Sequence, residues 1–362
     1  MNQNHIKILF ILPSLAAGGA ERIMSFVAQN LDENKFDIKL IVIGFKERTV
    51  YNTNNLTVVY LNKTRVLNSI FSLFRLLKRE KADIVISSIV HLNTFLAFFS
   101  VFFSKTKFIA REANVLSVLS KHNPYNNILF SKKMIVFAYK LVDKIICQSN
   151  DMRQDLIANY DVPLHKTELI NNPITNSFKL KTHNRDKNKP LHFITITRLS
   201  KHKGHHRILD ALSKVNFQFK YTIIGHGTEK GSIYNYAKDN GLLDFIEFIK
   251  YTNEVDEYLS ESDLYLQGSY VEGFPNILIE SCVVGTPVLA FNAPGGLDEI
   301  IVDGQNGYIA NTSEEFVDYL NSINSNYIFK PEVINSIVTN RFNKEKIINQ
   351  YEEFFINLTS AK

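Results

Sequence analysis

The sequence predicts an α/β protein with two doubly wound parallel sheets. Short β-branched runs alternate with amphipathic stretches of helix length along the 362-residue chain, as in folds whose helices cover both faces of a parallel sheet. The alternation stops once, in the polar segment 171–190, which has a proline near each end, and then starts again. The length also suits two domains of ordinary size. We therefore expect two Rossmann-like domains that face each other across a cleft.

The expected elements follow this alternation in order. In the first domain, strands are expected at 6–12, 37–44, 56–61, 82–88, 107–111 and 143–149, and helices at 20–34, 67–80, 92–103 and 131–142. In the second domain, strands are expected at 191–198, 220–225, 245–249, 263–269 and 287–291, and helices at 204–215, 229–240, 253–260 and 275–284. The domains then span 1–175 and 191–342, with a linker at 176–190. The last helix, within 343–362, could pack locally or cross back to the first domain.

Composition narrows the cellular setting of the protein. Cys147 and Cys282 lie far apart in apolar surroundings, which argues against a disulfide framework and for a reducing compartment. The first twelve residues lack the basic start of a signal peptide, and the longest apolar run, 91–105, is too short to span a bilayer as a helix. We therefore expect a cytoplasmic protein, either soluble or peripheral on the inner face of the cell membrane.

The net charge of +5 is unevenly distributed along the chain. Residues 1–178 hold 22 Lys and Arg against 13 Asp and Glu, whereas residues 179–362 hold 19 against 23. A basic first half indicates an anionic partner, such as a membrane surface or a phosphorylated substrate, or simply a solvated lysine-rich surface. The segment 65–81, with basic residues around an apolar helical pattern, is either a membrane contact or a core helix. Nucleic acid is disfavoured because no basic run is interleaved with aromatic residues.

The candidate site residues of the first domain lie in loops after strands, where open α/β sheets bind ligands. Gly18 and Gly19 stand where a helix begins, and they either let a phosphate or sugar approach backbone N–H groups or form a tight turn. His91 follows the fourth strand and is a catalytic candidate, although a lone histidine is more often structural. Arg111 and Glu112 follow the next strand and could pair with each other or contact an anionic or hydroxylated ligand.

Two loops of the second domain carry features suited to a nucleotide. Arg198 ends a strand and Lys203 precedes a helix, so the two cations could clamp a diphosphate, unless both are merely solvated. Gly225 and Gly227 follow the next strand, but Gly231 comes one residue too late for a dinucleotide fingerprint. This loop either lets a base approach the backbone or is an ordinary turn.

The segment 269–296 holds the most specific pattern of the chain. Glu272 lies in a loop, and Glu280 follows about one and a half turns into a helix that Pro275 starts. Helical spacing puts both carboxylates near one rim, with the N–H groups of Gly273 and Phe274 between them. Carboxylates accept two hydroxyl hydrogen bonds, which suits the vicinal diols of sugars and ribose. A solvated pair of acids is disfavoured because Glu280 is surrounded in sequence by core-type residues.

Six motifs occur in order along the chain: GGAER, NNPI, TRLSKHKG, IIGHG, EGFPNILIESCVVGTPVLA and PGGLDEII. In this order and spacing they resemble the retaining glycosyltransferases of family four, which have the two-domain type B fold. The resemblance runs nearly end to end and is most specific at the two glutamates. Among such enzymes the chain looks most like bacterial ones that extend lipid-linked, lipopolysaccharide or capsule glycans.

The resemblance implies a role for each candidate. Arg198 and Lys203 would neutralise the donor diphosphate, Glu280 would hold the ribose hydroxyls, and Glu272 would hold the sugar. The implied donor-binding set is Gly18, Gly19, Arg198, Lys203, Gly225, Gly227, Glu272, Gly273, Phe274, Pro275, Asn276 and Glu280. The implied catalytic set is Glu272, Lys203, Arg198 and His91. Pro294–Gly296 would border the donor, and no metal or other cofactor is expected, in keeping with the missing Asp-x-Asp pair.

The chain departs from the family pattern at two places. Many relatives carry a histidine where this chain has Arg111 and Glu112, so the histidine role would pass to His91 or be absent. Thr175 stands where an acid is common. Both departures concern the acceptor side, to which Arg111 and Glu112 are assigned, and the first domain would bind the acceptor.

The function expected from these features is transfer of a hexose or N-acetylhexosamine from a nucleotide sugar, UDP-linked, to a lipid-linked or polysaccharide acceptor at an anionic membrane surface. Three alternatives remain: an epimerase-like type B enzyme acting on nucleotide sugars, a GDP-mannose-dependent mannosyltransferase, and an inactive binding module.

Overall fold

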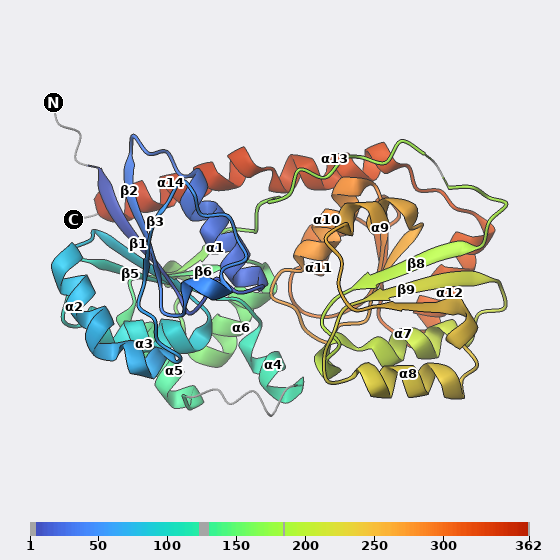
Figure 1. The fold of residues 1–362 in the computed structure, drawn as a ribbon, viewed down its shortest axis with the longest axis horizontal. Coiled ribbons are helices and arrows are strands. Elements are labelled where there is room, and N and C mark those ends of the chain that lie inside the picture. Colours follow the sequence, from blue (N-terminus) through green and yellow to red (C-terminus); the bar gives the residue numbers. More distant parts are fainter. Residues whose placement is uncertain (1–4, 123–129, 184, 361–362) are drawn as a thin grey trace. The chain divides into compact units, whose positions relative to one another are not determined.

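The computed structural model describes residues 5–122, 130–183 and 185–360 and divides into two compact units (Figure 1). Unit 1 comprises Met1–Ala113, Asn127–Thr175 and Lys344–Lys362, and unit 2 comprises Asn114–Asn126 and Asn176–Asn343. The segment 114–126, assigned from the sequence to the first domain, is therefore grouped with unit 2. Each unit contains one parallel sheet with helices around it, which confirms the predicted fold class.

Unit 1 contains a seven-stranded sheet in the order β3-β2-β1-β4-β5-β6-β7, in which all neighbours are parallel. Its strands are β1 (Ile6–Leu12), β2 (Phe36–Val42), β3 (Thr57–Tyr60), β4 (Ile84–Ser88), β5 (Lys107–Arg111), β6 (Lys144–Cys147) and β7 (Thr167–Leu169). Its helices are α1 (Gly19–Asn30), α2 (Ile70–Glu80), α3 (Val90–Ser100), α5 (Lys132–Leu141), α6 (Asn150–Tyr160) and α14 (Lys344–Ser360), with short 3-10 turns η1 (Lys46–Arg48), η2 (Val66–Ser69) and η3 (Leu164–Lys166). The reversal of strand order at β1 puts the loops after β1 and β4 at the switch point where such sheets bind ligands.

The last helix, whose position the sequence left open, belongs to the core of unit 1. Phe355 is fully buried, and its ring meets those of Phe10 in β1 and Phe36 in β2 edge-on, with centroids 6.4 and 6.2 Å apart. Tyr351 is also fully buried in this cluster. Glu352, on the same helix, accepts hydrogen bonds from the Lys35 ammonium and from the Asp32 N–H, both just before β2. The apolar face of α14 therefore completes a core begun more than 300 residues earlier in the chain.

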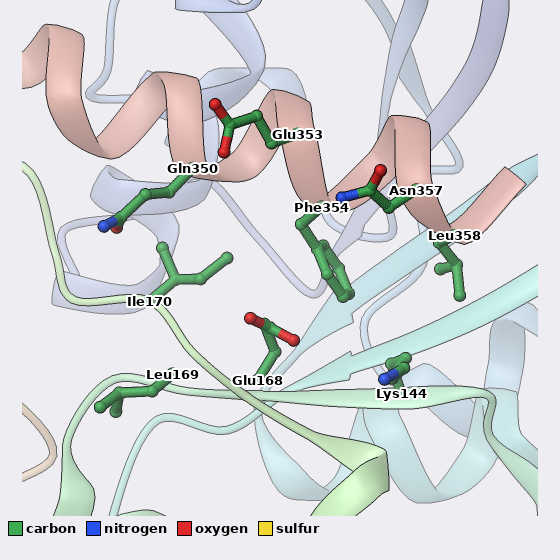
Figure 2. A pocket seen from close by; sticks show the side chains of 9 residues that line it. All are labelled: Lys144, Glu168, Leu169, Ile170, Gln350, Glu353, Phe354, Asn357 and Leu358. Atoms are coloured by element: carbon green, nitrogen blue, oxygen red, sulfur yellow. The ribbon is translucent and has the colours of Figure 1, made fainter. Parts of the chain in front are cut away.

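A cavity of about 360 Å³ lies between α14 and the strands β6 and β7 (Figure 2). Glu168 from β7 rises toward the helix beside Phe354, with Lys144 from β6 nearby. The cavity lies along the side edge of the sheet, because β7 is its last strand, and not at the carboxyl ends where ligands of such folds bind.

Unit 2 contains a six-stranded parallel sheet in the order β10-β9-β8-β11-β12-β13. Its strands are β8 (Leu191–Ile196), β9 (Phe219–Ile224), β10 (Ile246–Ile249), β11 (Leu264–Gln267), β12 (Val288–Phe291) and β13 (Gly307–Ala310). Its helices are α4 (Leu116–His122), α7 (His205–Leu212), α8 (Lys230–Asp239), α9 (Val255–Glu261), α10 (Asn276–Val284), α11 (Leu297–Ile300), α12 (Ser313–Ser325) and α13 (Pro331–Phe342), with 3-10 turns η4 (Lys201–Lys203) and η5 (Leu243–Phe245). The order again reverses, between β8 and β11, and places the loops after these two strands together.

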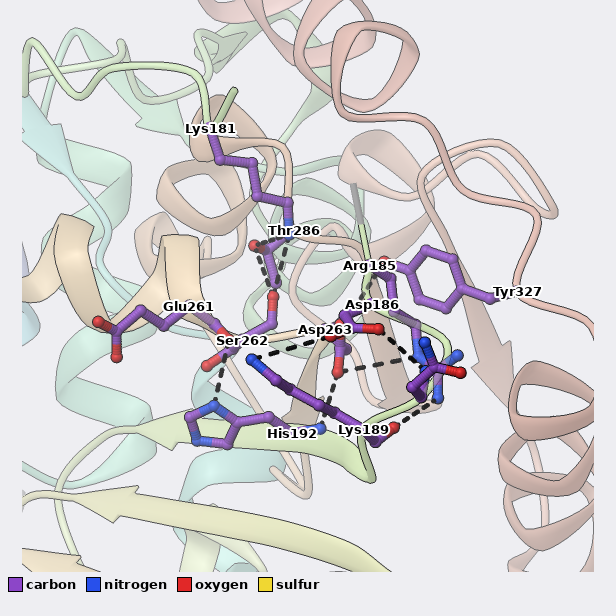
Figure 3. A network of polar contacts seen from close by, with 11 residues as sticks. Lys181, Arg185, Asp186, Lys189, His192, Glu261, Ser262, Asp263, Thr286 and Tyr327 are labelled. Carbon is purple, nitrogen blue, oxygen red and sulfur yellow. Dashed lines mark hydrogen bonds and ion pairs between the residues drawn. The ribbon is translucent and has the colours of Figure 1, made fainter. Parts of the chain in front are cut away.

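The linker segment is tied to unit 2 by a polar network (Figure 3). Lys181 donates to the Ser262 carbonyl and the Thr286 hydroxyl, each at 3.0 Å, and its own N–H donates to the Val284 carbonyl. Burial lowers the pKa of Lys181 to about 8. Farther along, the Arg185 guanidinium lies 3.9 Å from Asp263 and over the ring of Tyr327. The described linker residues Lys181 and Arg185 are therefore both bonded to unit 2.

Most strands and helices lie where the sequence predicts them, but β7 and β13 are not among the predicted strands. With only three and four residues, they are too short for a period of two to stand out. Within the described residues, no helix combines the length and apolar composition needed to cross a lipid bilayer.

Candidate functional site

The candidate site of unit 2 is centred on an ion pair between Lys203 and Glu272. Lys203 ends η4 in the loop after β8, and Glu272 lies in the loop after β11. The Lys203 ammonium lies 2.6 Å from Glu272 Oε1, which also accepts a hydrogen bond from the Ser269 hydroxyl at 2.6 Å. Glu272 Oε2 has no hydrogen-bond partner among the residues the structure describes. One carboxylate oxygen is thus fixed by the protein, and the other can accept a hydrogen bond from a ligand.

Arg207, which the sequence analysis did not select, holds the loop that carries Glu272. From α7 its Nε donates to the Gly268 carbonyl at 2.5 Å, and a second nitrogen donates to the Ser269 carbonyl. The guanidinium lies 4.3 Å from the ring centroids of both Tyr270 and Phe291. Burial lowers the pKa of Arg207 to about 10, so it remains a cation near neutral pH. No sequence pattern signals this role, because all the bonded groups are backbone carbonyls and rings distant in the chain.

Glycines bring the loops of this site into backbone contact. Gly204 and Gly268 face each other so closely that a Cβ on either would collide with the other's carbonyl group. Gly225 and Gly227 likewise pack against the backbone of Thr197 and Leu199 in the loop after β8. The structure thus gives Gly225 and Gly227 a packing reason for lacking side chains, whereas the sequence suggested donor contact or a turn.

Glu280 lies on α10, within the same unit as Glu272, and is 8% exposed. Its Oε1 accepts a hydrogen bond at 3.3 Å from Asn176 of the linker. Pro275 is the residue just before the helix and Asn276 is its first residue, so the loop through Gly273 leads directly into the positive end of α10.

Two neighbouring features fix the loop between Glu272 and α10. The ring of Phe274 is buried and packs edge-on against Phe342 of α13, with centroids 5.5 Å apart. On the other side, Glu272 N–H donates to the Pro294 carbonyl at 2.9 Å. Gly295 has φ +133° and lies so close to the Glu272 backbone that a Cβ would collide with it. The Pro294–Gly296 turn thus packs against the backbone of Glu272 and holds it in place.

Arg198 is the second cation of the site. Its side chain is exposed and forms no ion pair with another described residue. Lys203 and Arg198 flank the loop after β8, as the sequence predicts, but only Lys203 is engaged by an acid. The arrangement offers two cations for a diphosphate, and two carboxylates and a helix start for hydroxyl groups.

In unit 1, the loop after β1 is held by a tyrosine that sequence reasoning missed. The Tyr51 hydroxyl accepts from Gly18 N–H and donates to the Gly18 carbonyl, each at 2.7 Å. Gly18 is the residue before α1, Gly19 is the first residue of the helix, and the Glu21 carboxylate lies beside Gly18. The Gly18 N–H is therefore already bonded within the protein. Of the two glycines, Gly19 is the one that stands in the first turn of α1, where N–H groups have no partner within the helix.

His91 lies in the first turn of α3, directly after a strained residue. Ile89 has φ +80°, a region that is rare for β-branched residues and costs roughly 1–3 kcal/mol. The His91 ring is partly buried, and burial lowers its pKa. His91 is therefore a neutral imidazole near pH 7, and the strained turn fixes where it lies.

Arg111 and Glu112 are inside unit 1, although the sequence placed them on the acceptor side as possible ligand contacts. Arg111 is 0% exposed and donates to Asn172 Oδ1 at 2.6 Å, and Glu112 is 1% exposed and accepts from Asn93 of α3 at 2.9 Å and from Tyr139. Burial raises the pKa of Glu112 to about 7. In this arrangement both residues support the start of α3 from inside and have no surface for a ligand.

Among the described parts of the chain, no three His, Cys, Asp or Glu side chains gather in a way that could hold a metal ion. Burial lowers the pKa of His202 and that of His205, the latter to about 4, so both are neutral imidazoles at pH 7.

Sequence models of two protein families match the two halves of the chain. "Glycosyltransferase Family 4" matches residues 17–178, and "Glycosyl transferases group 1" matches residues 177–340. A Campylobacter jejuni protein named N-acetylgalactosamine-N,N'-diacetylbacillosaminyl-diphospho-undecaprenol 4-alpha-N-acetylgalactosaminyltransferase is 24% identical over 321 residues, which cover 85% of this chain and 87% of that protein.

Solved structures share the fold over almost the whole chain. The lipopolysaccharide outer core galactosyltransferase WaaB, in its apo form, has a TM-score of 0.78 and 18% identity over 97% of this chain and 99% of its own. Anabaena HepE in complex with UDP and glucose has a TM-score of 0.79 and 20% identity over 98% and 100%. At these identities, the likeness concerns the fold, which is that of the two-domain type B glycosyltransferases.

Proposed function

Because the chain belongs to the glycosyltransferases that these two family models describe, we propose that it transfers a hexose or N-acetylhexosamine from a UDP-sugar to a lipid-linked oligosaccharide, lipopolysaccharide or capsule acceptor in bacterial polysaccharide synthesis. The observation that carries the proposal is the Lys203–Glu272 pair in unit 2, with one Glu272 oxygen open to a ligand. The name of the Campylobacter protein supports the acceptor, since it contains a diphospho-undecaprenol saccharide. The Anabaena complex with UDP and glucose supports the donor.

Each residue of the unit 2 site has a role in this proposal. Lys203 and Arg198 bind the donor diphosphate and stabilise the negative charge that develops on it as the sugar leaves. Glu280 accepts hydrogen bonds from the ribose hydroxyls, and Glu272 Oε2 accepts a hydrogen bond from a hydroxyl of the sugar. Arg207 is a positioning residue, because it acts through the loop that carries Glu272.

The reaction proceeds with retention of the anomeric configuration and without a metal ion. Glu272 Oε1 is engaged by Lys203 and Ser269, an environment suited to hydrogen bonding rather than to nucleophilic attack. The acceptor hydroxyl then attacks on the face from which the diphosphate departs, and a leaving phosphate oxygen takes its proton. The positive charges of Lys203 and Arg198 replace the charge that a metal would supply.

A donor panel tests the proposal. UDP- and GDP-linked hexoses and N-acetylhexosamines are compared by thermal shift, since a bound ligand raises the apparent stability, and the best donor is then assayed with and without a lipid-linked acceptor. We expect a UDP-sugar to bind, Glu280→Gln to weaken its binding by about tenfold, a loss of roughly 1.4 kcal/mol, and EDTA to leave turnover intact. The product should have the anomeric configuration of the donor by NMR.

The same experiment separates the alternatives. Conversion of the donor without acceptor would identify an epimerase-like enzyme, and a shift with GDP-mannose alone would identify a mannosyltransferase. No shift with any nucleotide sugar would contradict the proposal and leave a binding module of another kind.

An anionic membrane surface is the proposed partner of unit 1. Large apolar side chains are exposed on α2, at the end of α3 and on α5, which cover one side of the sheet (Figure 1). They are Phe71 (87% exposed), Val101 (60%), Phe102 (69%), Met134 (42%) and Phe137 (56%). The same helices carry exposed Arg75, Lys78, Lys132 and Lys133, so the surface combines apolar contact with positive charge.

Liposome co-sedimentation tests the membrane partner. We expect the protein to sediment with vesicles that contain phosphatidylglycerol, to do so less at high salt, and to lose most of this binding when Phe71 and Phe102 are both replaced by serine. The exposed pair Val50 and Leu164, also in unit 1, provides a control of two apolar-to-serine changes outside these helices. Equal sedimentation with neutral and anionic vesicles at low salt would argue against this partner.

A further inference from the structure

A second cavity of about 360 Å³ opens in unit 1 at the carboxyl ends of β1 to β4. Its walls come from the residues that follow these strands: Pro13 after β1, Ile43 after β2, Lys63 to Leu67 after β3, and His91 after β4. It therefore lies at the edge and at the strand reversal where open parallel sheets bind ligands. Its size is at the lower end for ligand pockets and suits a small group rather than a whole glycan.

The two cationic side chains of this cavity have no partner among the described residues, whereas the hydroxyl of Thr64, which also lines it, accepts a hydrogen bond from Asn68. Lys63 and Arg65 line it, and neither forms an ion pair or a side-chain hydrogen bond with any other residue that the structure describes. Elsewhere in unit 1 several cations are paired, as Lys7 and Lys39 are with Glu80. No acidic residue is among those that line the cavity. Two cations with no counter-charge in a concave site are the complement of an anion.

His91 adds a neutral donor to the two cations. Its imidazole also has no hydrogen-bond partner among the described residues. Its place depends on the strained backbone of Ile89 and on the buried contacts beneath α3. There, Asn93 accepts from Ser87 at 2.8 Å and donates to the Arg111 carbonyl at 2.9 Å. The fold thus keeps Ile89 in a costly backbone conformation, and this conformation places the unpartnered imidazole of His91 at the cavity wall.

The remaining wall is apolar. Pro13, Ile43, Val66 and Leu67 form it, and Leu67 is 45% exposed. An inorganic anion would gain nothing from this wall, whereas an anion joined to a hydrocarbon chain would bury part of that chain against it.

We propose that this cavity binds the diphosphate of a prenyl-diphosphate-linked acceptor, with Lys63 and Arg65 on the phosphate oxygens, His91 donating a hydrogen bond, and the apolar wall against the first carbons of the lipid. The proposal rests on the proposed function, because it gives the acceptor of that reaction a subsite in unit 1. It also gives His91 a binding role at the diphosphate.

Calorimetry with a water-soluble, short-chain prenyl diphosphate tests the subsite without any transfer reaction. We expect the wild-type protein to bind this probe more tightly than inorganic diphosphate. The double variant Lys63→Ala with Arg65→Ala should bind it at least about tenfold more weakly, because it loses the charge-assisted hydrogen bonds from both cations to the phosphate oxygens. The control variant Lys105→Ala with Lys140→Ala, exposed in the same unit, removes equal charge and should bind as the wild type does. Equal affinity of both double variants for the probe would overturn the proposal.

Two further arms separate the sources of phosphate and the two hypotheses. Anionic vesicles without diphosphate lipid test whether the cavity binds a bilayer headgroup instead. The proposal would be overturned if the Lys63 and Arg65 variant lost vesicle binding while the wild type did not bind the soluble probe. Binding of UDP by the wild type and by the variant, measured on the same samples, reports on the proposed donor site, whose cations Arg198 and Lys203 lie in unit 2. A wild type that binds the probe in this cavity but transfers no sugar would retain the subsite and refute the function, whereas active transfer with an unchanged acceptor KM in the variant would refute the subsite.

Discussion

Replacing Lys203 by alanine should lower kcat/KM for the nucleotide-sugar donor by about 10²-fold or more, a loss of roughly 2.7 kcal/mol or more in transition-state stabilisation. In the proposed reaction Lys203 supplies a cation to the leaving diphosphate, and in the structure its ammonium lies 2.6 Å from Glu272 Oε1. Its removal would take away a charge that the proposed transition state needs. Among the described residues it would leave Ser269 as the one side-chain donor to the largely buried Glu272 carboxylate.

Steady-state kinetics with the donor identified by the panel provide the measurement. Lys201→Ala is the matched control, because Lys201 lies in the same 3-10 turn, is exposed and has no side-chain partner among the described residues. A double-mutant cycle with Glu272→Gln should show a coupling between the two residues, since they are in contact. If Lys203→Ala were as active as Lys201→Ala, the assignment of the donor site to this pair would be wrong.

Replacing Phe355 by alanine should destabilise unit 1 by about 3–5 kcal/mol, the usual cost of removing a buried aromatic ring. The side chain is fully buried and touches the rings of Phe10, Phe36, Tyr351 and Phe354. The cavity left behind would lie between α14 and the central strands of the sheet, where the surrounding elements can relax only partly.

Hydrogen exchange is the suitable measurement, because a chain with two units need not unfold in one step. Amides of β1 and β2 should exchange faster in Phe355→Ala, while amides of β8 and β11 in unit 2 should not change. The neighbouring Ile356, which is 36% exposed, provides the control Ile356→Ala, with an effect within about 0.5 kcal/mol. Unchanged exchange in β1 would contradict the place of α14 in this core.

The candidate residues of unit 2 could be selected from the sequence because their signals are local. Pro275 and the first turn of α10 lie between Glu272 and Glu280, and this spacing predicts that both carboxylates lie near one rim. Lys203 could be placed near that rim by a general property of parallel sheets, since both loops follow strands. The direct Lys203–Glu272 contact was not predictable, because it depends on how closely the two loops approach, and that approach requires Gly204 and Gly268 to lie back to back.

Residues whose role depends on distant partners were missed or misplaced. Arg207 looks like any arginine on an amphipathic helix, and its bonds to the loop after β11 appear only in the folded chain. Arg111 and Glu112 follow a strand as site residues do, yet both are buried, because Asn172, Asn93 and Tyr139 close over them. A position after a strand indicates the edge of the sheet but gives no information on whether the side chain points inward.

The sequence by itself determined the fold of two parallel sheets, since periodicity and turn residues report on local structure, and its short motifs supplied the residues of the proposed donor site. Only the tertiary structure decided that α14 completes the core of unit 1, that Arg111 and Glu112 are internal supports, and that Lys63, Arg65 and His91 share one cavity. These features depend on contacts between segments that are far apart in the chain. Such contacts depend on how distant segments pack together. Many different local sequences would pack equally well, so the local pattern does not reveal which contacts form.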